Sequence, residues 1–127
     1  MSIGAGPHIS NGIQHIPHLT TLDLPSNPIY PIGAEHISNA LLHIPHLTTL
    51  RLSDPFLGAI GIEHISNGLL HVPHLTTLEL DWAVGAQHIA NALHHVRHLT
   101  VLKLECCDIG DTGADYISKG LYSMFQI

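Results

Sequence analysis

Leu19-Thr20-Thr21-Leu22-Asp23-Leu24 is the stretch of this chain from which its architecture can be worked out. The same pattern returns three times, at spacings of 28, 28 and 24 residues. The later copies are Leu47-Thr48-Thr49-Leu50-Arg51-Leu52, Leu75-Thr76-Thr77-Leu78-Glu79-Leu80 and Leu99-Thr100-Val101-Leu102-Lys103-Leu104. A period in this range is typical of arrays in which one small unit stacks on the next. We therefore predict a single repeat array over residues 1–127, with residues 1–18 as a partial first unit.

Each copy of the pattern has the two-residue alternation of a strand. Leu22 and Leu24 would point to one face of that strand, and Thr21 and Asp23 to the other. Threonine and branched residues also favour strands. We predict strands near residues 19–24, 47–52, 75–80 and 99–104.

A helical pattern follows each strand. Its apolar residues recur at i, i+3, i+4 and i+7, as in Ile37, Ala40, Leu41 and Ile44, which form one stripe of a short helix. In three units a proline before the next strand ends the helix, because proline cannot continue it. These prolines are Pro17, Pro45 and Pro73, and Arg97 takes their place in the fourth unit.

The second residue of the helical stripe is always glycine or alanine. Glycine costs about 0.5–1 kcal/mol relative to alanine inside a helix. Its recurrence at Gly12, Gly68 and Gly120 therefore needs a physical reason. We predict that helix and strand approach each other closely at these positions, with no room for a side chain.

Alternating strands and helices predict a parallel sheet whose crossovers are right-handed. Strands in a sheet lie about 4.8 Å apart, whereas packed helices need about 8–10 Å. The helical side of the stack is then longer than the strand side, so the array must curve. The predicted fold class is an α/β horseshoe, a right-handed solenoid with a short parallel sheet on the concave face and helices on the convex face.

The repeats resemble the leucine-rich-repeat family, whose pattern is Leu-x-x-Leu-x-Leu-x-x-Asn/Cys-x-Leu. The 28-residue length, and Leu-Glu-Cys-Cys-Asp-Ile-Gly-Asp-Thr-Gly-Ala over residues 104–114, are similar to the ribonuclease-inhibitor-like subclass. That subclass also occurs in the sensor regions of NOD-like receptors. The resemblance implies a protein-interaction module, serving as a scaffold or as the ligand-sensing region of a cytosolic protein.

The chain departs from this family pattern in two ways. The family's Asn/Cys position is Asn27 and Cys107 in two units but Pro55 and Ala83 in the others, so nearby backbone groups there need other partners. The third unit also lacks four residues before Gly85. Either this is an ordinary loop deletion, or it creates a bend that exposes Trp82 as a binding anchor.

The composition argues against several classes of protein. The formal net charge is −6 and only 11% of the 127 residues are charged, whereas nucleic acids and anionic membranes attract basic surfaces. No apolar run approaches the roughly 18–20 residues that span a bilayer, and the N-terminal residues do not resemble a signal peptide. The adjacent Cys106 and Cys107 suit a reducing compartment. We expect a cytoplasmic chain that uses no cofactor and binds neither nucleic acid nor membrane.

Twelve of the thirteen histidines fall on three repeated positions, which duplication of one ancestral unit explains without any chemistry. One column directly precedes the strands and consists of His18, His46, His74 and His98. A metal-binding protein is one alternative, although the spacing lacks known zinc motifs. A pH-responsive binding protein is another, because histidine titrates near neutrality and rings about 5 Å apart would repel one another when charged.

The sequence contains no recognisable catalytic constellation, with neither a Gly-x-Ser-x-Gly nor a phosphate-binding loop. Cys107 would be a buried turn residue, and buried cysteines are usually inert. We therefore predict no enzymatic activity. A GTPase-activating or regulatory role is an alternative, because Ran-type activators use similar repeats, and Arg51 and Arg97 are the arginines that could serve it.

The outward strand positions predict a binding surface. One column alternates in charge (Asp23, Arg51, Glu79, Lys103), so its members either neutralise one another across the sheet or recognise a ligand. An acidic rim follows the strands and consists of Asp54, Asp81, Glu105 and Asp108. Such a rim would attract a basic protein partner. The candidate binding residues are Thr21, Asp23, Thr49, Arg51, Thr77, Glu79, Asp81, Trp82, Lys103 and Glu105.

Neither end of the array reads as the polar capping unit that solenoids normally need. Two interpretations stay open. The chain is a piece of a longer protein of the NOD-like-receptor type, or it associates end to end through its terminal units.

Overall fold

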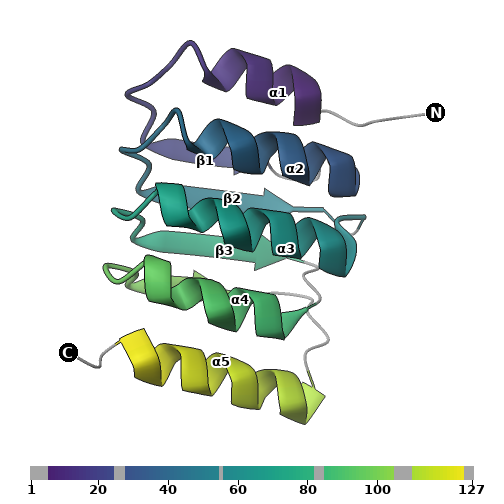
Figure 1. Ribbon diagram of the computed structural model, residues 1–127, viewed down its shortest axis with the longest axis vertical. Helices are drawn as coiled ribbons and strands as arrows, with labels where there is room; N and C mark the ends of the chain where they lie inside the picture. Colours follow the sequence, from purple (N-terminus) through teal and green to yellow (C-terminus); the bar gives the residue numbers. More distant parts are fainter. Residues whose placement is uncertain (1–5, 25–27, 55, 82–84, 105–109, 125–127) are drawn as a thin grey trace.

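The computed structural model describes residues 6–24, 28–54, 56–81, 85–104 and 110–124 (Figure 1). Strands and helices alternate along these residues. The elements are α1 (Gly6–Ile13), β1 (Thr21–Leu24), α2 (Tyr30–Leu41), β2 (Thr49–Ser53), α3 (Gly58–Gly68) with the 3₁₀ turn η1 (Leu69–His71), β3 (Thr77–Asp81), α4 (Ala86–Ala92) with the 3₁₀ turn η2 (Leu93–His95), β4 (Val101–Lys103) and α5 (Gly110–Met124).

The strands form one parallel sheet in the order β1-β2-β3-β4, so each strand pairs with the strand of the next unit. Equivalent residues lie side by side: Leu22 pairs with Leu50, and Leu50 pairs with Leu78. All helices stack in chain order over one face of the sheet (Figure 1). The predicted alternation of parallel strands and helices is confirmed, and the opposite face of the sheet, here called the strand face, carries no helix in the described chain.

Each strand begins two residues later than the sequence predicted. The first leucine of the pattern belongs to the turn after the helix, because the N–H of Leu47 donates to the carbonyl of Ile44 at 3.2 Å. Sheet pairing starts at the threonines, where the N–H of Thr48 and the N–H of Thr49 both donate to the carbonyl of Thr20. The hydroxyl of Thr48 adds a third bond to that carbonyl at 3.1 Å.

The core lies between the sheet and the helices. The inward strand leucines, such as Leu50 and Leu78, are completely buried, as are the helix residues Ile37 and Leu41. Complete burial of one such side chain stabilises a fold by about 1.5–3 kcal/mol. Leu102 of the edge strand β4 is only partly buried. The predicted two-residue alternation and the helical stripe therefore meet in one aliphatic core.

The glycines Gly68 and Gly120 do make a close approach, but the prediction that a strand lies against them is wrong. A Cβ on Gly68 would lie 2.6 Å from Ser38 Oγ, and a Cβ on Gly120 would lie 2.8 Å from the carbonyl oxygen of Ala90. Both neighbours belong to the preceding helix, so these glycines bring helix onto helix rather than helix onto strand. Gly12 has nothing within 4 Å of its Cβ position, because α1 is the first helix of the stack.

No helix among the described residues is long and apolar enough to cross a bilayer.

Candidate interaction surface

The strand face gathers the predicted outward columns. Register pairs Thr21 with Thr49 and Thr49 with Thr77, and these threonines are partly or fully exposed. The next column, the charged column, pairs its members in the same way, and it consists of Asp23, Arg51, Glu79 and Lys103. The sequence had therefore placed both columns on the correct face of the sheet.

Arg51 lies at the centre of the charged column. Its Nε donates to Glu79 Oε2 at 3.2 Å, and its NH1 nitrogen lies 3.9 Å from Asp23 Oδ2. The Arg51 side chain is 42% exposed, so solvent screens both pairs and their contribution to stability is small. An arginine held between two carboxylates is also poorly placed to reach a GTP phosphate.

The third expected pair of this column does not form. Glu79 and Lys103 are register partners, yet no ion pair within 4.0 Å joins them in the described part of the chain. Glu79 already accepts from Arg51, and Lys103 on the edge strand β4 is exposed. The two ion pairs of the column therefore both involve Arg51, and Lys103 is exposed at the edge strand.

A hollow of about 220 Å³, here called the Arg51 hollow, lies at the end of β1–β3. It is lined by Asp23, Arg51, Leu52, Ser53, Glu79 and Asp81. Its walls carry the carboxylates of Asp23, Glu79 and Asp81 against the one guanidinium of Arg51, so the local charge is negative. Asp81 Oδ1 is buried and has no hydrogen-bond partner among the described residues. A buried carboxylate oxygen is costly to leave unpaired, so the hollow favours a ligand that brings hydrogen-bond donors.

Asp54 does not belong to the acidic rim where the sequence analysis placed it. It is completely buried, and its Oδ2 accepts from the backbone N–H of Ile29 at 2.7 Å and of Tyr30 at 3.1 Å. Its Oδ1 accepts from the N–H of Phe56 at 2.9 Å. The sequence did hold the signal, because Asp54 has the same parity along the strand as the inward Leu50 and Leu52.

Several predicted residues cannot be placed on this surface. Trp82, Glu105 and Asp108 lie outside the described residues, as do the four positions of the Asn/Cys ladder, Asn27, Pro55, Ala83 and Cys107. Asp54 supplies bonds of the kind expected of that ladder, because its carboxylate accepts from the N–H groups of Ile29 and Tyr30, where α2 of the preceding unit begins.

Two segments match a leucine-rich-repeat model. The family model, described as Leucine Rich repeat, matches residues 15–38 and residues 95–118. The segments begin at His15 and His95, which hold the same place in their repeats, so the family match and the internal period agree in register. The parallel four-stranded sheet with its alternating helices confirms the predicted α/β solenoid, and the two matched segments are similar to leucine-rich repeats. No curated protein shows significant similarity to the sequence.

The histidine column before the strands is partly stacked. The ring centroids of His18 and His46 lie 6.1 Å apart with an interplanar angle of 20°, and those of His74 and His98 lie 6.4 Å apart at 21°. All of these rings are exposed. In the described ranges, no three histidine, cysteine or acidic side chains come together as metal ligands.

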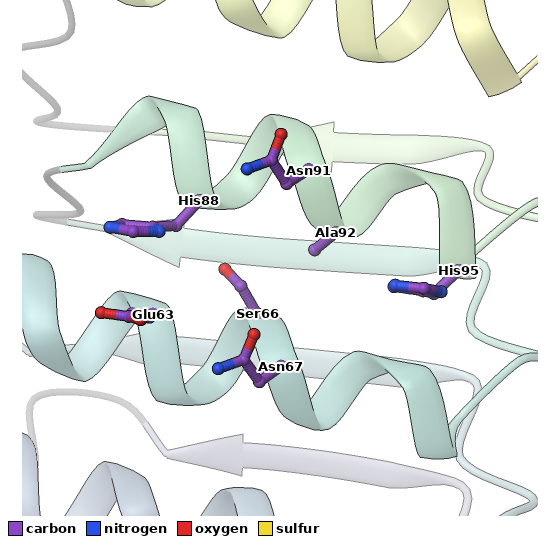
Figure 2. A pocket seen from close by; sticks show the side chains of 7 residues that line it. All are labelled: Glu63, Ser66, Asn67, His88, Asn91, Ala92 and His95. Carbon is purple, nitrogen blue, oxygen red and sulfur yellow. The ribbon is translucent and has the colours of Figure 1, made fainter.

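A second hollow lies between two helices of the repeat stack, on the side away from the strand face (Figure 2). This α3–α4 groove has a volume of about 240 Å³ and is lined by Glu63, Ser66, Asn67, His88, Asn91, Ala92 and His95. None of these residues was predicted as a site from the sequence. The available signal was the shortened 24-residue spacing between the third and fourth strand patterns.

Proposed function

We propose that this chain is a protein-interaction module that holds a basic segment of a partner protein against its strand face, at the Arg51 hollow. The observation that carries the proposal is the buried, unpaired Asp81 Oδ1 in a hollow whose carboxylates outnumber its single guanidinium. A lysine or arginine side chain would supply the missing donors and would be drawn in by the surrounding charge. Leucine-rich repeats are commonly interaction scaffolds, and one of the two matched segments, residues 15–38, contains Asp23 of this hollow.

The finer assignment is a ribonuclease-inhibitor-like array within a cytoplasmic sensor or scaffold. Support for it comes from the 28-residue spacing and from the motif at residues 104–114. Trp82 and Glu105, which lie outside the described residues, stay predicted contact residues.

Charge reversal at the hollow tests the proposal. Asp81→Lys removes the unpaired carboxylate, and Asp111→Lys changes the net charge equally on the exposed first turn of α5. With an oligolysine peptide as the probe, we expect Asp81→Lys to weaken binding about tenfold at low ionic strength and Asp111→Lys to weaken it less than twofold. The Asp81 carboxylate is partly desolvated in the hollow, whereas solvent screens the exposed Asp111 carboxylate. Isothermal titration at two salt concentrations measures both. Equal losses in the two variants would mean that the peptide senses only the overall charge, and the Arg51 hollow would then not be the site.

A further inference from the structure

The α3–α4 groove lies where a short helix follows a longer one. In α3 and α5 the residue facing the preceding helix is Gly68 or Gly120, and a Cβ at either position would lie within 3.0 Å of that neighbour. The equivalent residue of α4 is Ala92, which lines the groove, whereas the alanine at the same position of α2, Ala40, is completely buried. Helix α4 has 7 residues where α3 has 11, so the fall in strand spacing from 28 to 24 lies in the helix itself. Helix α4 therefore leaves room against α3.

Ser66 shows that this room is unfilled. The serine at the equivalent position of the first unit, Ser10, donates its Oγ to the backbone carbonyl of His36 on the next helix at 3.0 Å. Ser66 is only 5% exposed, yet its Oγ has no hydrogen-bond partner among the described residues. Figure 2 shows its hydroxyl oxygen directed from α3 towards α4, across the groove. A buried hydroxyl without a partner is destabilising, so a ligand that reaches it gains affinity.

The other groups around Ser66 define the ligand. Glu63 supplies a carboxylate at one end of the groove, and Asn67 directs its amide oxygen towards α4 (Figure 2). A guanidinium has five N–H donors in a planar fork and no acceptor, so it can bond several of these oxygens together. An anion would instead meet the Glu63 carboxylate on a chain whose net charge is −6. The groove is also smaller than the roughly 300–1,000 Å³ of typical small-molecule sites, which suits one side chain.

We propose that the α3–α4 groove binds the guanidinium group of an arginine side chain from a partner polypeptide. This site lies between α3 and α4 and shares no lining residue with the Arg51 hollow on the strand face. Glu63 pairs with the guanidinium at the groove mouth, and the Ser66 hydroxyl accepts one of its N–H groups inside.

Amide chemical shifts of the full chain, measured during titration with acetyl-Gly-Arg-Gly-amide, test the proposal. We expect shift changes centred on Ser66, Asn67 and Asn91, and about fivefold weaker binding of the matched citrulline peptide, whose urea group has the same shape without the charge. Free L-arginine, which carries its own carboxylate beside Glu63, should bind more weakly than the peptide. Tighter binding of free arginine would assign the groove to a small metabolite and overturn the polypeptide source.

Variants with matched controls locate the binding. Glu63→Gln should weaken the arginine peptide about fivefold, a modest loss because the side chain is exposed. Glu35→Gln changes the same position of the preceding repeat, where Gly68 closes the helix pair, and should alter binding less than twofold. Ala92→Leu should fill the groove and abolish the shifts.

Two results would overturn this site: equal binding of the arginine and citrulline peptides, or equal losses in Glu63→Gln and Glu35→Gln. Asp81→Lys distinguishes this site from the one in the proposed function. The variant changes the Arg51 hollow and should leave the chemical-shift changes at Ser66 as they are. Loss of oligolysine binding at the strand face with intact shifts at Ser66, or the reverse, would show which of the two sites had failed.

Discussion

Asp54 connects three backbone N–H groups, those of Ile29, Tyr30 and Phe56, through one buried carboxylate. Tyr30 needs this support, because its φ of 62° is a left-handed conformation that side chains rarely adopt. Gly58, the first residue of α3, stands 28 positions later with a φ of 65°. The Asp54 carboxylate thus holds an entry into α2 that has no glycine.

We expect Asp54→Ala to lower the free energy of unfolding by about 2–4 kcal/mol, because buried N–H groups lose their acceptor. Asp111→Ala, on the exposed first turn of α5, should change it by less than about 0.5 kcal/mol. Urea denaturation followed by circular dichroism measures both values. Similar values for the two variants would show that Asp54 is not the structural residue inferred here.

At the scale of the helix, one side chain decides how closely neighbouring repeats pack. Gly68 lies against Ser38 and Leu41 of α2, and Gly120 lies against Ala90 and Leu93 of α4. Gly12 is at the same position of its repeat but faces open space. The same substitution should therefore have opposite effects in different helices.

Gly68→Ala should destabilise the chain by about 1–3 kcal/mol, since the new methyl group overpacks the α2–α3 contact. Gly12→Ala should stabilise it by up to about 1 kcal/mol, because alanine is the better helix former and meets no neighbour. Thermal melts of the two variants and of the parent give the sign of each effect. A stabilising Gly68→Ala would contradict the close helix contact.

At the scale of the whole molecule, β1 and β4 are the edge strands of the described sheet. Each presents unpaired backbone groups on its outer side, which is the usual route to association between sheets. The register of the repeats is constant, with Thr21 beside Thr49 and Thr77 beside Val101. A second copy could therefore add its β1 to β4 in the same register.

We propose that the chain as given associates end to end through these edges. Light scattering over a range of concentrations should show an average mass that rises with concentration and falls again on dilution. A mass that stays at 13.8 kDa throughout would show that the edges are tolerated in a monomer.

The sequence determined the repeat, the parallel strand order, the core leucines and the faces of the strand residues, including Asp23, Arg51 and Glu79. These follow from local geometry, because a strand repeats every two residues and a helix every 3.6. Asp54 follows the same alternation and is buried. The prediction that it belongs to an exposed acidic rim was wrong because a charged residue was taken to be exposed.

The tertiary structure alone decided the distances between units. Whether Glu79 pairs with Arg51 or Lys103 depends on side-chain reach across strands, and whether a glycine meets a helix or a strand depends on the stack. The unpaired Ser66 and the groove around it arise where the short helix α4 packs on the longer α3. Such spacing is a joint property of two repeats, and no single repeat's sequence contains it.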